Sequence, residues 1–254
     1  MVEKENKPRA VVITGGGTGI GRAMAETFVK NGDQVVIIGR REEVLRATAQ
    51  AIGPNCTWQR ADVSVLEQVV AAVGAVVARF GHIDVLVNNA GYNRAMSAEM
   101  TVEQAKAVWD EMLSNNLTGA FLMTYAALPH LTRPGGRIIN ISSDAALNGG
   151  AGLRTLGYVP AKAGLHGLTR SVAQVVSPEG ITANTITPGF IRDSEGNQRL
   201  PDDVVQGIAR HLLVRRPGSV KDIAAAAFYL ASPEAGYITA EVLNANGGRA
   251  SWKA

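Results

Sequence analysis

The sequence predicts an α/β fold, a doubly wound and mostly parallel sheet with helices on both faces, formed as a single domain over residues 1–254. Short apolar runs recur along the chain, and such runs indicate strands that are buried on both faces. Helical periodicity fills the gaps between them, and this alternation is typical of βαβ units. With 46% hydrophobic and 19% charged residues, the composition is that of a globular enzyme with a sizeable core.

The individual elements follow from the same pattern. Strands are expected at 10–14, 34–39, 56–61, 84–88, 137–142, 181–187 and 241–244. Helices are expected at 19–31, 65–79, 108–131 and 160–177, with a further helix beginning at Glu42. Residues 190–216 interrupt the alternation with a polar stretch that is followed by an amphipathic one. An insertion beyond a strand end of a doubly wound sheet lies over the ligand crevice, so we expect this segment to cover the substrate.

The charge pattern and the residue counts argue against several classes of protein. The 25 basic and 22 acidic residues are scattered along the chain, so nucleic acid is not an expected partner. Cys56 is the single cysteine, which excludes a disulfide within the chain and favours a reducing compartment. The four histidines stand apart from one another without the spacing of metal ligands, so no metal site is expected.

No segment has the character of a membrane anchor or a secretion signal. Residues 1–9 mix Glu and Lys, and no signal-peptide apolar core follows them. The longest nearly apolar stretch, at 69–78, is half of the roughly 20 residues that a membrane span needs. We therefore expect a soluble, cytoplasmic protein with no membrane contact.

A glycine-rich turn, Thr14-Gly-Gly-Gly-Thr18-Gly-Ile-Gly21, lies between the first expected strand and the first expected helix. It departs from the dinucleotide fingerprint GxGxxG, but the physical features are the same. Glycines permit a tight turn and a close backbone approach, and a helix N-terminus attracts a pyrophosphate. The turn predicts a dinucleotide site, and the alternative is a purely structural turn. The expected binding residues are Gly15, Thr18, Gly19, Ile20 and Gly21.

Two more motifs lie where the carboxyl ends of strands would meet. Asn88-Asn89-Ala90-Gly91 ends the strand expected at 84–88, and ligands of open sheets bind at such ends, although the motif alone is also an ordinary turn. The segment Tyr158-Val-Pro-Ala-Lys162 opens the helix expected at 160–177. Its Tyr and Lys are four residues apart, so they share one face of this helix. A nearby ammonium favours the phenolate, which suits the tyrosine to acid–base chemistry; alternatively the pair is a chance surface feature.

Taken together, these motifs occur in the order and approximate spacing of the short-chain dehydrogenases/reductases, which the chain resembles over essentially its whole length. The resemblance implies a Rossmann-type, NAD(P)-binding domain with a catalytic tetrad of Asn116, Ser143, Tyr158 and Lys162. Ser142 is the less favoured serine, since the family's serine follows the strand by the step that Ser143 occupies.

The resemblance also implies roles for the tetrad. Tyr158 would exchange a proton with the reacting oxygen, and Ser143 would hydrogen-bond that oxygen. Lys162 would lower the pKa of Tyr158 and hydrogen-bond the nicotinamide ribose, and Asn116 would hold a water that relays protons. The remaining cofactor contacts implied by the motifs are Asp62, Val63, Asn89, Ala90, Gly91, Pro188, Gly189 and Ile191. Relatives often carry Thr two residues after that Ile, where this chain has Asp193.

The end of the second expected strand favours NADP(H) as the cofactor. An acidic residue there would accept hydrogen bonds from the adenosine ribose, but Gly39 holds that position. Arg40 follows, and its planar fork suits a 2′-phosphate, with Arg41 as a second charge. The alternative is that both arginines are simply solvated, and Thr18 stands where NADP-dependent relatives often have a basic residue.

The substrate expected from this chemistry is a small molecule with a carbonyl group or a secondary alcohol. The resemblance to 3-oxoacyl-thioester reductases makes a carrier-protein or coenzyme A thioester the alternative. Pro134 and Glu179 stand where reductases that bind a carrier protein have basic residues, although Arg133 and Arg137 are close by. A non-catalytic, dinucleotide-sensing regulator is the alternative of another class. Relatives pair the helices corresponding to 108–131 and 160–177, so a homotetramer is expected, although apolar Leu122, Ala126, Leu165 and Leu168 would equally fit the subunit's own core.

Overall fold

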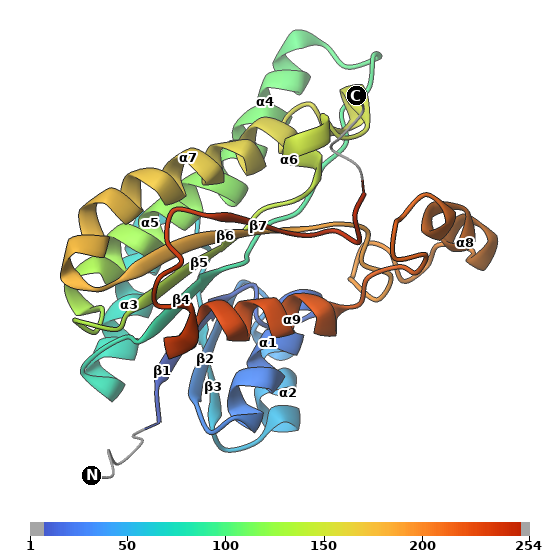
Figure 1. Cartoon of the computed structure of the whole chain (residues 1–254). Helices are drawn as coiled ribbons and strands as arrows, with labels where there is room; N and C mark the ends of the chain where they lie inside the picture. The colour runs from blue at the N-terminus through green and yellow to red at the C-terminus, as the bar shows by residue number, and fades with distance from the viewer. Residues whose placement is uncertain (1–7, 250–254) are drawn as a thin grey trace.

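The computed structural model describes residues 8–249, and within them seven strands form one parallel sheet in the order β3-β2-β1-β4-β5-β6-β7 (Figure 1). The strands are β1 Ala10–Thr14, β2 Gln34–Gly39, β3 Cys56–Arg60, β4 Val85–Asn88, β5 Arg137–Ile141, β6 Thr182–Pro188 and β7 Val242–Ala245. The strand order runs outward in both directions from β1 and β4, which pair with each other. This is the doubly wound arrangement that the sequence predicts, and its crevice lies at the β1–β4 junction.

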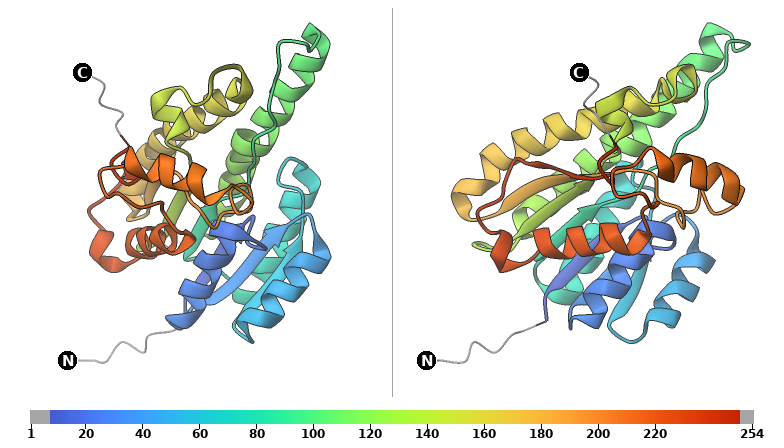
Figure 2. Two further views of the ribbon diagram at one scale, coloured as in Figure 1. Left: turned by 90° about the vertical axis from the view of Figure 1, so that its right-hand side faces the viewer. Right: turned by 45° about the vertical axis from the view of Figure 1, so that its right-hand side comes forward.

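Helices cover both faces of the sheet (Figures 1 and 2). They are α1 Gly19–Lys30, α2 Glu42–Ile52, α3 Leu66–Phe80, α4 Val102–Leu113, α5 Gly119–Ala127, α6 Ala145–Asn148, α7 Tyr158–Val176, α8 Asp202–Arg210 and α9 Val220–Leu230. Successive residues of β1 point to opposite faces, as the pleat of a strand requires. Val11 and Ile13 pack with α1, α2 and α9, whereas Val12 packs with α3, α5 and α7.

The helix expected at 108–131 differs from the observed one in length and in continuity. α4 begins six residues earlier, at Val102, because Thr101 and Gln104 form a capping box. A π-helical turn, Ser114–Thr118, then joins α4 to α5, and α5 ends at Ala127 before a short 3₁₀ turn that contains Pro129. The structure therefore replaces one continuous helix with two helices around a π-turn that carries Asn116.

α9 is a helix that the sequence analysis did not place. Ser219 and Asp222 form the capping box at its start, and its apolar face packs on α1, where the rings of Phe28 and Phe228 lie 5.5 Å apart. Its run of four alanines lacks a contrasting polar face, so the periodicity that marks an amphipathic helix is weak. The other predicted elements agree with the structure to within one or two residues.

The segment at 190–216 leaves the sheet at the carboxyl end of β6 and carries α8, which stands beyond the strand ends (Figure 2). A single β-bridge between Ile191 and Gly218 closes the base of this segment. Within residues 8–249, no helix is both long and apolar enough to cross a membrane.

Candidate active site

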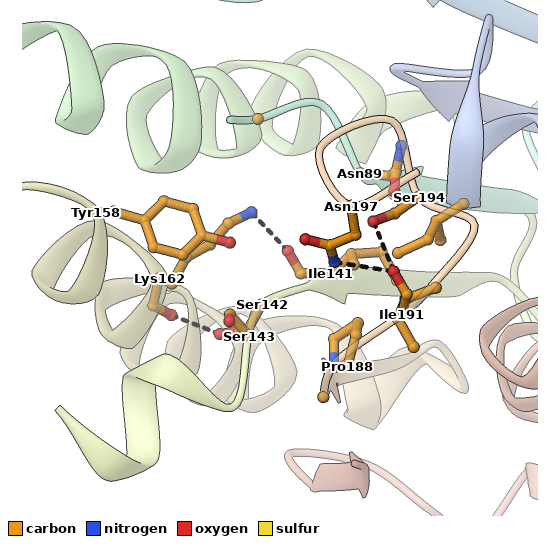
Figure 3. Close-up of a pocket in the computed structure, with 13 residues that line it drawn as sticks. Asn89, Ile141, Ser142, Ser143, Tyr158, Lys162, Pro188, Ile191, Ser194 and Asn197 are labelled. Carbon is orange, nitrogen blue, oxygen red and sulfur yellow. Dashed lines mark hydrogen bonds between the residues drawn. The ribbon is translucent and has the colours of Figure 1, made fainter. Parts of the chain in front are cut away.

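The carboxyl ends of β4, β5 and β6 and the start of α7 surround a cavity of about 270 Å³ (Figure 3). Its lining residues are Ile20, Asn89, Gly91, Ile141, Ser142, Ser143, Tyr158, Lys162, Pro188, Gly189, Ile191, Ser194 and Asn197. Nine of these were predicted as site residues from the sequence, and the fold brings them together from five separate stretches of chain. The cavity lies where an open parallel sheet binds its ligand.

The glycine-rich turn borders this cavity and favours glycine at Gly15 for its backbone conformation and at Gly21 for lack of space. Gly15 has a φ of 65° and donates its N–H to the carbonyl of Ile38 at 2.7 Å. A Cβ on Gly21 would lie 2.1 Å from the carbonyl oxygen of Gly15, so any side chain would displace backbone. Thr18 is the N-cap of α1, yet its side chain makes no capping hydrogen bond. The first-turn amides of α1 are therefore available to an anion.

The Asn88-Asn-Ala-Gly91 motif ties this turn to the end of β4. Asn89 Nδ2 donates to the carbonyls of Thr14 and Gly15, at 3.0 and 3.2 Å. The N–H of Ala90 donates to Thr14 Oγ1 at 3.0 Å, so Ala90 anchors the turn rather than lining the cavity. The motif thus holds two strand ends and the glycine-rich turn in a fixed relation.

Of the two adjacent serines, Ser143 is the one placed to act on a reacting oxygen. The Ser142 hydroxyl donates to the carbonyl of Lys162 at 2.8 Å (Figure 3). It also lies 2.9 Å from His166 Nε2, so both of its contacts are with α7. The Ser143 hydroxyl instead lines the cavity together with Tyr158, accepts the N–H of Ala145 at 3.2 Å, and acts to lower the pKa of Tyr158. Ser143 therefore stays the serine that we expect to act on the substrate.

Burial dominates the protonation of the tyrosine and the lysine. It raises the pKa of Tyr158, and the charge of Asp144 raises it further, while the hydrogen bond with Ser143 opposes the rise. Lys162 is 4% exposed, and its burial lowers the pKa of its ammonium to about 8. Its Nζ donates to the carbonyl of Ile141 at 2.8 Å and lies 5.8 Å from the centre of the Tyr158 ring. In this structure burial thus outweighs the expected pKa-lowering effect of Lys162, and Tyr158 is held as a neutral phenol.

Asn116 lies in the π-turn and faces the space beside Lys162. Its Nδ2 donates to the carbonyls of Tyr92 and Met112, both at 3.0 Å. Its Oδ1 is buried and has no hydrogen-bond partner among residues 8–249. A Cβ built on Gly91 would lie 2.3 Å from this oxygen and 3.1 Å from Lys162 Nζ. The amide oxygen and the ammonium therefore border one small space that a side chain at position 91 would fill.

The residues expected to bind the adenosine end lie outside the cavity, at the ends of β2 and β3. Arg40 Nη1 is 3.8 Å from Asp62 Oδ2, and its guanidinium lies over the Tyr92 ring at 5.3 Å. Asp62 Oδ1 accepts hydrogen bonds from the backbone and side chain of Ser64. Val63 packs against α5, where a Cβ on Gly119 would be 2.6 Å from its Cγ2. Arg41 pairs with Glu195, a contact that the sequence analysis did not predict.

Several cavity residues were missed from the sequence, above all Ser194 and Asn197. The motif Asp193-Ser-Glu-Gly-Asn197 was noted only as a polar interruption, and its polarity was the available signal. Asp193 Oδ1 accepts the N–H of Val220 at 2.8 Å and so supports the start of α9. Ser194 supplies a hydroxyl to the cavity one residue beyond the position where relatives often have Thr, and this hydroxyl donates to Ile191 at 2.9 Å.

Comparisons with known proteins identify the family of this chain. A family model described as enoyl-(acyl carrier protein) reductase matches residues 15–250. The chain is 40% identical to the short-chain reductase protein NovJ of Streptomyces niveus, over 94% of this chain and 92% of NovJ. It is 35% identical to the 3-oxoacyl-[acyl-carrier-protein] reductase FabG of Vibrio harveyi, over 94% of this chain and 96% of FabG.

A solved structure gives the same result for the fold. A variant of the actinorhodin polyketide ketoreductase, determined with NADPH, superposes with a TM-score of 0.84 at 29% identity. The match covers 96% of this chain and 98% of that one. The chain therefore belongs to the short-chain dehydrogenase/reductase family of oxidoreductases.

Proposed function

We propose that this protein is an NADPH-dependent ketoreductase, which reduces a ketone to a secondary alcohol and can run in reverse, with Tyr158 as the general acid or base. The observation that carries the proposal is the convergence of Ser143, Tyr158 and Lys162 on one cavity beside the glycine-rich turn. A nucleotide-sensing regulator would have no need of a half-buried phenol and a buried ammonium in contact with that cavity.

The residues present fit a dinucleotide. The glycine-rich turn has no room for a side chain at Gly21, and the first turn of α1 offers uncapped amides to a pyrophosphate. Asn116 Oδ1 is a buried acceptor that still lacks a partner in the described part of the chain. Arg40 and Arg41 directly follow the end of β2, the strand end that faces the adenosine ribose in this fold, and their charges suit a 2′-phosphate. The family member determined with NADPH supports the same choice of cofactor.

Each residue of the tetrad has a role that follows from its surroundings. Bound NADPH supplies a hydride to the carbonyl carbon, and negative charge then develops on the carbonyl oxygen. The raised pKa of Tyr158 keeps its phenol protonated, so it donates the proton that this oxygen needs. Ser143 stabilises the oxygen by a hydrogen bond. Lys162 and Asn116 border the space through which a water would return a proton to Tyr158.

The substrate we favour is a small ketone or alcohol, and the segment at 190–216 would cover it. A 3-oxoacyl thioester on a carrier protein is the second candidate, favoured by the identity with FabG. The surface that would hold a carrier gives less support. Arg133 is paired with Glu179, and Arg137 is 7% exposed, so neither guanidinium is free for an acidic partner.

We further propose a cytoplasmic homotetramer. Its single cysteine, Cys56, is buried and suits a reducing compartment. On α5, Phe121 and Tyr125 are 44% and 67% exposed, although both are large aromatic residues. Leu66 and Val70 on the neighbouring α3 are exposed as well. This apolar surface lies on one of the two helical regions expected to pair, and burying it would favour association.

A spectrophotometric screen tests the proposed activity. The purified protein is mixed with NADPH and a panel of free ketones, quinones and 3-oxoacyl thioesters, the thioesters both as coenzyme A and as carrier-protein derivatives. Oxidation of NADPH with free ketones supports the favoured substrate class, and turnover of thioesters alone supports the second candidate. Tight NADPH binding without turnover of any compound would instead favour the regulator.

The cofactor preference is tested separately. One well-placed arginine on a phosphate contributes roughly 1.5–3 kcal/mol, which predicts an approximately tenfold to hundredfold higher kcat/KM with NADPH than with NADH. Arg40→Ala should lose most of this preference and leave kcat/KM for NADH nearly unchanged. Equal or better use of NADH by the wild type would overturn the assignment.

A further inference from the structure

We infer that Glu195 sets the strength of the preference for NADPH, because its carboxylate competes with the 2′-phosphate for Arg41 and Thr18. The inference rests on the proposed 2′-phosphate site at Arg40 and Arg41. It adds a specificity-determining residue from the segment at 190–216, which is distant in sequence from the turn that binds the cofactor.

The carboxylate of Glu195 makes the contacts that a bound phosphate would make with Arg41 and Thr18. Arg41 Nη1 donates to Glu195 Oε1 at 2.9 Å, and Arg41 Nη2 donates to Oε2 at 3.2 Å. The Thr18 hydroxyl donates to the same Oε2 at 2.8 Å. A guanidinium presents this two-pronged geometry to carboxylate and phosphate alike. The carboxylate of Glu195 therefore occupies donors that a 2′-phosphate would use.

The position of Glu195 is set by the backbone of its segment. A Cβ built on Gly19 would lie 3.5 Å from the amide nitrogen of Glu195, so the segment passes directly over the glycine-rich turn. Asn197 Nδ2 and the Ser194 hydroxyl both donate to the carbonyl of Ile191, at 2.9 Å each (Figure 3). These bonds fold the segment back on itself and hold Glu195 toward Arg41. Arg41 and Thr18 in turn lower the pKa of Glu195, which keeps it ionised at neutral pH.

Arg40 differs from Arg41 in its distance from the nearest carboxylate. Its nearest carboxylate oxygen, on Asp62, is 3.8 Å away, and Asp62 is already hydrogen-bonded to Ser64. Arg40 can thus turn to a phosphate without breaking a close ion pair, whereas Arg41 must first release Glu195. A dinucleotide without a 2′-phosphate places no second anion there, so it leaves the Arg41–Glu195 pair intact. Glu195 therefore weakens binding of NADPH and leaves that of NADH nearly unchanged.

The solvent exposure of Arg41 and Glu195 limits how much their ion pair weakens phosphate binding. The side chains of Arg41 and Glu195 are each 58% exposed, so solvent screens their attraction. We expect removal of the Glu195 charge to tighten binding of a 2′-phosphate by about twofold to fivefold, and less at high ionic strength.

Titration calorimetry with two small probes isolates this effect from turnover. Adenosine 2′,5′-bisphosphate carries the 2′-phosphate, and 5′-AMP lacks it. Glu195→Gln should bind the bisphosphate several-fold more tightly than the wild type does and bind 5′-AMP equally well. Glu195→Asp keeps the charge and should stay closer to the wild type. Glu234→Gln, in the turn beyond the far end of α9, is the control for the same change of net charge.

Arg41→Ala separates the inference from the cofactor site on which it rests. If Arg41→Ala weakens the bisphosphate and Glu195→Gln tightens it, with no gain from Glu195→Gln in the Arg41→Ala background, the competition is supported. If Arg41→Ala weakens it and Glu195→Gln does not tighten it, the inference is overturned and the cofactor site stands. If Arg41→Ala has no effect, Arg41 is outside the 2′-phosphate site and the inference is overturned with that part of the site.

Discussion

At the scale of single residues, Tyr158 and Lys162 are governed by their burial. Lys162 is 4% exposed, and the only hydrogen bond that its Nζ makes within residues 8–249 is to the carbonyl of Ile141. The lowered pKa of Lys162 and the raised pKa of Tyr158 have the same largest cause, which is loss of solvation. A phenol that stays protonated is suited to the reduction of a carbonyl, and of the two groups Lys162 has the pKa nearer to neutral pH.

The shifted pKa values of Tyr158 and Lys162 predict the pH dependence of ketone reduction. The protonated lysine is present below its pKa of about 8 and is lost as the pH rises through it. The kcat/KM for NADPH, which reports the free enzyme, should be flat toward neutral pH and fall above about 8, approaching a tenfold loss per pH unit. A stopped-flow or initial-rate profile measures it. A kcat/KM that stays constant well above that pKa would contradict the assigned titration.

The sequence points to the proposed tetrad through the family resemblance, because its members are close to recognisable motifs. Tyr158 and Lys162 share a helix turn, and Ser143 follows a strand whose end is clear from the apolar pattern. The ion pair between Arg41 and Glu195 could not be predicted from local motifs, since 154 residues separate the two and only the folded path of the chain brings them together. The net direction of the Tyr158 pKa shift also depended on burial, which local spacing does not reveal.

At the scale of elements, the π-turn between α4 and α5 is the local feature that places Asn116. It faces α7, where a Cβ on Gly164 would be 2.6 Å from the side chain of Leu117. Periodicity predicted a helix across this region but could not predict the π-turn, because it is stabilised by packing against a distant helix. π-Turns within helices are frequent at functional sites, in keeping with the position of Asn116 beside Lys162.

The glycine-rich turn gives a prediction at the same scale. Gly21→Ala would put a Cβ 2.1 Å from the Gly15 carbonyl oxygen, so the turn must open. Overpacking of this kind costs roughly 1–3 kcal/mol, and affinity for NADPH and NADH should fall about tenfold or more for both. Fluorescence titration of each cofactor measures it.

Gly74→Ala is the matched control for that variant. Gly74 lies in α3, where an added Cβ would have no atom of residues 8–249 within 4 Å beyond its own helix, and alanine in a helix is favoured over glycine by roughly 0.5–1 kcal/mol. This variant should unfold at higher denaturant concentration and bind both cofactors as the wild type does. Unchanged cofactor affinity in Gly21→Ala would mean that the turn does not hold the dinucleotide.

At the scale of the whole molecule, the order of the strands determines where the site lies. The sheet runs outward from β1 and β4, and their carboxyl ends bring the glycine-rich turn next to the Asn88-Asn-Ala-Gly91 motif. Alternating strands and helices made this arrangement predictable. The oligomeric state was harder to predict from the sequence, because an apolar residue on a helix can face either a partner or its own core. Leu165 is buried in its own subunit, while Leu122, Ala126 and Leu168 are partly buried.

The exposed aromatic residues of α5 give the prediction about assembly. Light scattering at micromolar concentration should give about four times the 26.7 kDa of one chain. Tyr125→Asp places a charge on this apolar surface and should lower the mass to that of a smaller oligomer. A wild-type protein with the mass of one chain would contradict the proposed tetramer.

The central claim is that Tyr158 exchanges the proton with the reacting oxygen, and Tyr158→Phe tests it most directly. General acid–base groups contribute about a hundredfold to ten-thousandfold in rate. With a ketone that the wild type reduces, kcat for NADPH oxidation in Tyr158→Phe should fall by about a hundredfold or more. The Kd for NADPH should stay nearly unchanged, since the lost hydroxyl acts on the substrate rather than on the dinucleotide. A kcat like that of the wild type in this variant would contradict the account.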